Sequence, residues 1–239
     1  MTAHHSLKAR IHVITLAMTL GIVLSGGAIA LAAEPSPASK SASASTADSA
    51  TAVAAGLQEL QSRWANIQYQ TLEARRADAF EQLYQRAQTL LKAQPQSAEL
   101  HTWAGIIRGS QAGAEGGLSA LSQVKEARSE FEQALSIDPT TLDGSAYTSL
   151  GTLYHQVPGW PISFGDDDKA RQLLQKGLSL NPDGIDSNYF WADFLHDQEE
   201  DALARQALDK AMAAAPRPSR ETADAGRRQE IQALLKALR

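Results

Sequence analysis

Apolar residues recur at helical spacing along most of the chain. From Gly56 onward they fall mostly three to five residues apart, beginning with Leu57, Leu60, Trp64 and Ile67, as expected when one side of a helix is buried. Several later helices close with a shared pattern, in which apolar or small residues spaced four and three apart are followed by a proline five positions on. This pattern occurs at Leu83, Ala87, Leu90 and Pro95; at Ala127, Phe131, Ala134 and Pro139; at Ala170, Leu174, Gly177 and Pro182; and at Ala204, Leu208, Ala211 and Pro216. The chain therefore contains an internal helical repeat.

The repeat period indicates paired helices. The four closing prolines are separated by 44, 43 and 34 residues, and the last interval is the period of the tetratricopeptide repeat (TPR), a pair of antiparallel helices. On these residues, over about positions 63 to 216, the chain resembles TPR proteins. Gly105, Gly151 and Ala192 match the small residue of that family's first helix, whereas the family's tryptophan is absent from its usual place. The resemblance implies an all-α fold, a right-handed α-solenoid of about four helix pairs over residues 56–216.

The N-terminal 32 residues have the form of a secretory signal peptide. Lys8 and Arg10 precede an apolar run from Ile11 to Leu31, and a small-x-small cleavage site ends at Ala32. An uncleaved membrane anchor is the alternative, because about 20 apolar residues are enough to span a bilayer. In either case we expect the rest of the protein outside the cytoplasm, periplasmic or secreted, and attached to the inner membrane only if the leader is retained.

Two further segments flank the repeats. Residues 33–55 are expected to form a flexible, disordered linker, because Ser, Ala, Thr and Pro dominate them and no large side chain offsets the entropy of ordering. Residues 217–239 are expected to form a capping helix from about Glu221 to Leu238, covering the last repeat. The expected apolar side of this helix holds Ile231, Leu234, Leu235 and Leu238, and the expected solvent side holds Arg227, Arg228, Glu230 and Lys236.

Two repeats carry insertions between their paired helices. The first, GSQAGAEGGLSA at residues 109–120, is glycine-rich and predicts either a mobile loop or an extended helix with a break. The second, VPGWPISFGDDD at residues 157–168, cannot continue a helix because of its prolines and glycines. Trp160 and Phe164 form either an aromatic lip for a ligand or a plug against their own repeat. We expect the following aspartates to cap the next helix, since they lack the spacing of a calcium loop.

Polar residues of the first helices are the main binding candidates. In the solenoid that the resemblance implies, first helices line the concave groove, where such folds bind. The exposed positions of the third and fourth repeats would form a hydrogen-bonding strip made of Thr148, Thr152, His155, Tyr189, Asp193 and His196. The simpler alternative is an ordinary solvated helix face.

Charge and composition exclude several function classes. A formal net charge of −5 argues against nucleic acid as a partner. The absence of cysteine excludes disulfides, thiolate catalysis and cysteine metal sites. His155, Asp193 and His196 do not form an H-E-x-x-H motif, and no serine lies in a nucleophile elbow. We therefore expect no enzyme activity, no metal site and no cofactor.

The sequence thus predicts an exported binding scaffold that holds a protein partner in its concave groove. A second resemblance provides the alternative. The segments VPGWPISFG and NPDGIDSNYFWADFL are similar to the T-component proteins of tripartite ATP-independent periplasmic (TRAP) transporters, over residues 139–216. This resemblance implies an accessory protein that binds a small ligand or a periplasmic solute-binding protein, in some cases as a homo-oligomer. The lipid-bearing cysteine common in that family is absent.

Overall fold

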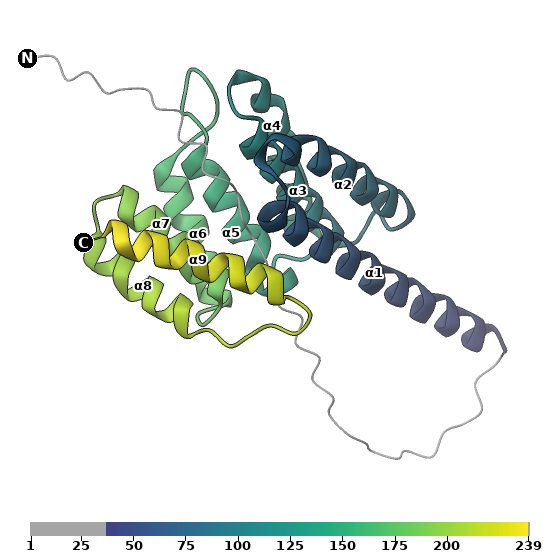
Figure 1. Ribbon diagram of the computed structural model, residues 1–239. Coiled ribbons are helices and arrows are strands. Elements are labelled where there is room, and N and C mark those ends of the chain that lie inside the picture. Colours follow the sequence, from purple (N-terminus) through teal and green to yellow (C-terminus); the bar gives the residue numbers. More distant parts are fainter. Residues whose placement is uncertain (1–36, 239) are drawn as a thin grey trace, which may run out of the picture.

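The computed structural model describes residues 37–238, which form an array of helix pairs (Figure 1). The pairs are α1 (Pro37–Gln70) with α2 (Glu73–Ala93), α3 (Ala98–Glu115) with α4 (Leu121–Ile137), α5 (Thr141–Gln156) with α6 (Asp167–Leu180), and α7 (Ile185–Asp197) with α8 (Asp201–Ala213). A short 3-10 helix, η1 (Leu118–Ala120), precedes α4, and α9 (Glu221–Ala237) ends the array. Within this part of the chain the only strand-like feature is an isolated bridge between Gly159 and Gly165. The predicted all-α solenoid of four helix pairs with a C-terminal helix is confirmed.

The repeated spacing marks where the paired helices cross. Each of the second helices, α2, α4, α6 and α8, ends two or three residues before its closing proline. The small residues of the pattern are fully buried, for example Ala127, Ala170 and Ala204 at 0% exposure. A methyl group added at Gly177 would lie 3.0 Å from the backbone nitrogen of Thr148 on α5. The helices of a pair therefore approach almost backbone to backbone, which only very small side chains permit.

The glycine-rich insertion extends a helix and then breaks it. Helix α3 runs through to Glu115, and Gly116 and Gly117 then adopt positive φ angles of 69° and 67°. Residues with a Cβ rarely adopt this conformation, so the pair of glycines ends the helix. Of the two alternatives that the sequence left open, the extended helix with a break is correct.

The aspartates at the end of the second insertion cap α6 as expected. Asp166 is the N-cap residue, and its Oδ1 accepts a hydrogen bond from the backbone nitrogen of Lys169 at 3.0 Å. Asp167 and Asp168 lie in the first turn, where their charges favour the positive end of the helix dipole. This confirms the capping interpretation.

Helix α1 corrects the boundary expected for the linker. Residues 37–55, expected as part of a flexible linker over 33–55, continue the helix that packs from Leu57 onward. Alanine is the strongest helix former, and adding turns to an existing helix is easier than nucleating a new one. The early part of α1 extends away from the array (Figure 1). The predicted signal peptide, residues 1–32, lies outside the described residues.

The C-terminal helix covers the last repeat and also reaches the first. Ile231 is fully buried, and Leu234, Leu235 and Leu238 pack on the cluster formed by α7 and α8, as expected. Helix α9 additionally contacts α1, so the two ends of the described array meet. Arg227, expected to face solvent, is 1% exposed and pairs with Asp186 on α7, so that expectation is wrong. None of the helices described combines the length and hydrophobicity needed to cross a membrane.

We expect Gly177→Ala to lower the free energy of unfolding by about 1–3 kcal/mol, because the added methyl group overpacks the crossing with α5. Gln175→Ala, at an exposed position of the same helix, should change it by less than about 0.5 kcal/mol. Urea unfolding of both variants measures the difference. A gain in stability for Gly177→Ala, as at an open helical position, would contradict the close crossing.

Candidate functional site

A cavity of about 770 Å³ lies among the ends of α1, α5 and α7, the starts of α2 and α6, and one side of α9. Its volume falls in the range of about 300–1,000 Å³ typical of ligand pockets. A second cavity, between α3, α4 and α5, has a volume of only about 20 Å³ and an apolar lining, which is enough for about one water molecule. The larger cavity is therefore the candidate binding site.

Four of the predicted groove residues line this cavity. His155 lies near the end of α5, and Tyr189, Asp193 and His196 lie along α7. Their spacing of three and four residues on α7 places them on one side of that helix. The structure thus brings together residues from the third and fourth repeats that the helical spacing had selected.

Thr148 and Thr152 do not belong to the site. Thr148 is 1% exposed and lies against Gly177 at the crossing of α5 and α6, and Thr152 is also buried. The hydroxyl of Thr152 donates to the backbone carbonyl of Thr148 at 2.9 Å. Because a threonine can satisfy its hydroxyl within its own helix, its polarity did not require a solvent-exposed position. The expectation that these two residues lie exposed on the concave face is wrong.

His155 links three helices at one end of the cavity. Its Nδ1 lies 2.7 Å from Oδ1 of Asp167 on α6, and its Nε2 lies 3.2 Å from Oδ2 of Asp197 on α7. Burial alone would lower the pKa of His155, but the hydrogen bonds to Asp197 and Asp167 outweigh burial and raise the pKa above its ordinary value. Both ring nitrogens are engaged with carboxylates, so the ring suits a structural, protonated role better than metal binding. Among the described residues, no group of three or more His, Asp or Glu side chains could hold a metal ion.

Tyr189 and His196 complete the α7 side of the cavity. His196 Nδ1 lies 2.7 Å from Oδ1 of Asp201 at the start of α8. Burial raises the pKa of the Tyr189 phenol, although the positive charge of Arg227 acts to lower it. The guanidinium of Arg227 lies 4.3 Å from the centre of the Tyr189 ring. Both side chains are held by neighbours from other helices, which makes the α7 side a preorganised surface.

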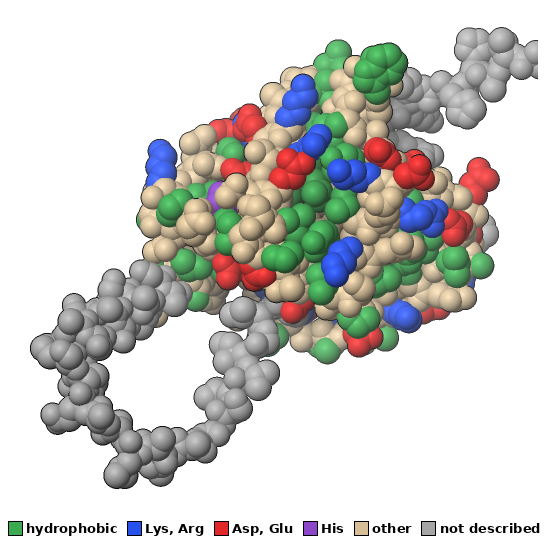
Figure 2. Space-filling view, turned by 180° about the vertical axis from the view of Figure 1, so that it is seen from behind, with side chains coloured by type: hydrophobic (Ala, Val, Ile, Leu, Met, Phe, Trp, Pro, Cys, Tyr) green, Lys and Arg blue, Asp and Glu red, His purple; other side chains and the backbone are tan. Residues whose placement is uncertain are grey.

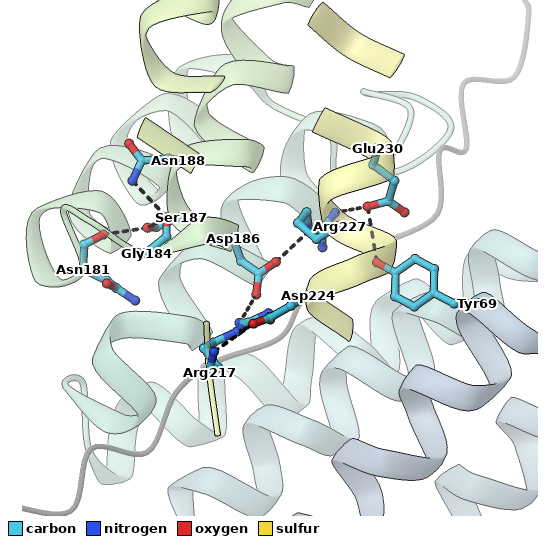
Figure 3. A network of polar contacts seen from close by, with 10 residues as sticks. All are labelled: Tyr69, Asn181, Gly184, Asp186, Ser187, Asn188, Arg217, Asp224, Arg227 and Glu230. Atoms are coloured by element: carbon cyan, nitrogen blue, oxygen red, sulfur yellow. Dashed lines mark hydrogen bonds and ion pairs between the residues drawn. The ribbon is translucent and has the colours of Figure 1, made fainter. Parts of the chain in front are cut away.

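A buried ion network fixes α9 as the opposite wall (Figure 3). Asp186, at the start of α7, accepts hydrogen bonds from Arg217 at 2.6 Å and from Arg227 at 2.7 Å. Arg217 also donates to Asp224 at 2.6 Å, and Arg227 pairs with Glu230. Burial would raise the pKa of Asp186, but the two guanidinium groups outweigh it and lower the pKa. Asp186 is therefore ionised and holds the C-terminal segment on α7.

Helix α1 joins the same network through its last turn. The hydroxyl of Tyr69 donates to Oε2 of Glu230 at 3.4 Å. A Cβ added at Gly226 would lie within 2.4 Å of carbon atoms of the Tyr69 ring. The close approach of α9 to α1 thus needs a glycine at position 226. Sequence reasoning missed this contact because its partners lie more than 150 positions apart.

Gln68 is one of the residues of the cavity that the sequence did not single out. It lies on α1 and is 4% exposed, and its side-chain carbonyl oxygen has no hydrogen-bond partner among the described residues. It sits beside the apolar stripe of α1, next to Ile67, so no periodic pattern marks it. That oxygen has almost no accessible surface, so it lies behind the surface of the cavity.

The cavity carries more acids than bases. The carboxylates of Asp167, Asp193, Asp197 and Glu230 line it, whereas Arg76 is the only lysine or arginine among the described residues of its lining. The Nε of Arg76 donates to the backbone carbonyl of Thr71 at 3.0 Å. On the face of the molecule drawn in Figure 2, acidic and basic side chains are interspersed with apolar ones. The lining of the cavity therefore has more carboxylates than lysine and arginine side chains.

The aromatic loop between α5 and α6 divides into an exposed and a packed residue. Trp160 is 90% exposed, which excludes a plug role for this side chain. Phe164 packs edge-on against Tyr154 with ring centres 5.3 Å apart, and the guanidinium of Arg128 lies 5.0 Å from the Phe164 ring centre. Phe164 therefore anchors the loop to its own repeat, and Trp160 projects into solvent.

Comparisons with known proteins support the fold. No protein-family model matches the chain, and no curated protein matches it. Among solved structures, TTC0263, a thermophilic TPR protein of Thermus thermophilus, is similar over 66% of this chain and 77% of its own, with 17% identity and a TM-score of 0.50. The MamA protein matches over 75% and 90% with 19% identity and a TM-score of 0.40, and PilF of Pseudomonas aeruginosa over 77% and 93% with 18% identity and a TM-score of 0.33. The chain thus has a TPR-like fold.

Trp160→Ala should leave the free energy of unfolding within about 0.5 kcal/mol of the native value, because an exposed side chain loses little packing. Phe164→Ala should lower it by roughly 1–3 kcal/mol, less than the roughly 3–5 kcal/mol of a fully buried phenylalanine. Thermal and urea unfolding of the two variants test this division of roles. Equal destabilisation by both substitutions would show that Trp160 also anchors the loop.

Protonation of His155 should stabilise the fold. Because the pKa of His155 is raised in the folded protein, its contribution is fully present below about pH 6.5, the ordinary pKa of histidine, and is lost as the pH rises through the raised value. The difference in free energy of unfolding between the native protein and His155→Asn should therefore be larger at about pH 6 than at about pH 9. Urea titrations at the two pH values measure it, and a difference that does not shrink with pH would contradict the assignment.

Proposed function

We propose that the protein is an exported, non-enzymatic scaffold that binds a segment of another protein in the 770 Å³ cavity. The observation that carries this proposal is the two-sided character of the cavity. Its α7 side presents Tyr189, Asp193 and His196, whereas α9 contributes Ala233, Leu234 and Ala237. A peptide segment with one polar and one apolar side complements such walls, since apolar area supplies affinity and placed polar groups supply selectivity.

The aromatic loop supplies a second contact for the same partner. Trp160 is the most exposed of the large apolar side chains in the described residues. An exposed tryptophan on an anchored loop is the kind of side chain that dominates binding energy at interfaces. Phe164 contributes indirectly, because its packing on Tyr154 holds the loop in place.

Export is part of the proposal and rests on the N-terminal sequence. The basic start, the apolar run and the small residues before Ala33 match a secretory signal peptide. The partner is then an envelope or extracellular protein, and membrane attachment occurs only if the leader is retained.

The second candidate function is that of a TRAP T-component-like accessory protein. The volume of the cavity favours it, because 770 Å³ also accommodates a small solute. In that case the protein partner would be a periplasmic solute-binding protein, and homo-oligomers would be expected from the resemblance.

Site-specific photocrosslinking in the native cells tests the scaffold. A photoreactive phenylalanine analogue is placed at Ala233, exposed inside the cavity, and in a control protein at Gln175, exposed on α6 outside it. We expect protein adducts from position 233 and none from position 175, in the envelope fraction, because the partner occupies the cavity.

Other outcomes of this experiment decide against the scaffold. Equal adducts at both positions would mean that the cavity is not the interface, and a purely cytoplasmic protein would refute export. A small molecule retained in native mass spectrometry, together with no adduct at position 233, would favour the accessory-protein alternative.

A further inference from the structure

We propose that His155, together with Asp167 and Asp197, forms a pH-sensitive latch at one end of the cavity. With both ring nitrogens protonated, His155 joins α5 to α6 and to α7 and holds the α7 wall in place. Loss of one proton releases α7 and weakens binding. The inference deepens the proposed function, because it rests on the cavity being the binding site and names how that site is regulated.

The latch lies where three helices meet. The His155 side chain is 9% exposed, and its Nδ1 and Nε2 face Asp167 on α6 and Asp197 on α7 at 2.7 and 3.2 Å. All three residues line the cavity. Helices α5 and α6 form one repeat and contact each other extensively, whereas α5 and α7 belong to successive repeats and contact each other much less. The position of α7 therefore depends more on the latch than the position of α6 does.

Only the doubly protonated ring can hold both carboxylates. Imidazolium donates from both nitrogens, whereas neutral imidazole has one donor and one acceptor. An ionised carboxylate only accepts hydrogen bonds, so a neutral His155 leaves one nitrogen lone pair facing a negative charge. The contact with Asp167 is the shorter of the two, and we expect the remaining proton to stay on Nδ1. Deprotonation therefore removes the hydrogen bond from α5 to Asp197 on α7.

The two carboxylates of the latch are the charged groups in contact with the ring among the described residues. Next to them, Phe194 of α7 lies edge-on to His155, with ring centres 5.0 Å apart. The guanidinium of Arg171 on α6 lies 4.8 Å from the Phe194 ring centre and pairs with Glu200. The rest of the cavity lining adds the ionisable groups of Arg76, Tyr189, Asp193, His196 and Glu230. The charge of the ring therefore depends above all on the two carboxylates that it contacts.

The pH range of the latch follows from these contacts. Burial acts to lower the pKa of His155, but the hydrogen bonds to Asp197 and Asp167 outweigh burial and raise the pKa above 6.5. The doubly protonated ring therefore persists above pH 6.5 and is lost as the pH rises through the raised pKa. The latch is closed on the acidic side of this range and open on the alkaline side.

The other two histidines among the described residues lack this arrangement. His196 Nδ1 faces a single carboxylate, that of Asp201, at 2.7 Å, and a neutral ring can keep this contact with its one N–H group. His101 faces Glu130 at 2.6 Å and the carbonyl oxygen of Pro95 at 3.1 Å, outside the lining of the cavity. The hydrogen bond to Glu130 raises the pKa of His101 as well, which makes His101 a matched control.

Amide hydrogen exchange of the purified full chain tests the latch. Labelling at about pH 6 and about pH 9 uses times scaled to the intrinsic exchange rate. We expect the last turn of α7, residues 194–197, to exchange about tenfold faster at the higher pH, because α7 has lost a charge-assisted hydrogen bond. Unchanged exchange of this turn, or the same acceleration over α3 and α4, would overturn the inference, since a uniform change reports only overall stability.

Three variants separate the latch from other titrations. His155→Asn should abolish the pH dependence of exchange in the last turn of α7. Asp197→Asn should also abolish it and keep the turn protected at the higher pH, because the new amide group donates to the neutral ring nitrogen. His101→Asn should retain the native pH dependence. Fast exchange at the higher pH in Asp197→Asn, or loss of the pH dependence in His101→Asn, would refute the assignment.

Crosslinking at two pH values connects the latch to binding. The photoreactive analogue at Ala233 is irradiated in envelope extracts buffered at about pH 6 or about pH 9. In the native background we expect the adduct yield to fall about fivefold at the higher pH, because only molecules with the α7 wall in place are competent to bind. In His155→Asn the yield should not depend on pH. Equal yields at the two pH values in the native background would contradict the regulation.

The two proposals fail in distinguishable ways. If position 233 gives no adduct at either pH while exchange in α7 follows the charge of His155, the latch stands and the protein scaffold is wrong. If adducts form in equal yield and exchange in α7 does not change with pH, the scaffold stands and the latch is wrong.

Discussion

The carboxylate of Asp186 is the constraint on which the rest of the structure depends. It is buried at the start of α7 and pairs with both Arg217 and Arg227 from the C-terminal segment, which also pair with Asp224 and Glu230. Removing one partner from a buried ion pair leaves the other charge buried without compensation, which destabilises a protein by about 3–5 kcal/mol. Helix α9 therefore has one well-defined position, between the last repeat and α1. In a solenoid each repeat contacts only its neighbours. Here α9 adds a direct contact between the first and the last helix.

The position of α9 turns a groove into a cavity. In an array of helix pairs the first helices leave a concave surface open along its length. Here α9 lies along that surface, and its Ala233, Leu234 and Ala237 face the polar ends of α5 and α7. His155 holds the opposite side together by bridging Asp167 and Asp197. The walls of the site are thus set by two ionic clusters from different parts of the chain, and the His155–Asp167 pair of one cluster joins the two ends of the loop that carries Trp160.

Local patterns predicted much of this architecture. The spacing of small residues and prolines predicted the helix pairs, because it reports contacts within a pair that are close in sequence. The same reasoning placed Asp166 as a cap and His155, Tyr189, Asp193 and His196 on the concave side. It placed Thr148 and Thr152 wrongly, since their hydroxyls bond within α5, and it treated residues 37–55 as a linker although alanine-rich segments extend a helix readily.

The ion network escaped prediction for a different reason. Asp186 pairs with residues 31 and 41 positions later, and Arg227 and Glu230 have the spacing of an ordinary solvated helix face. Glu230 belongs both to this network and to the lining of the cavity. Replacing it would take a carboxylate partner from Arg227 and disturb the wall, so a loss of binding there would not separate ligand recognition from folding. His155 lies on α5 and contacts Asp167 and Asp197 instead, so its substitution changes one end of the cavity while Asp186 continues to fix the position of α9.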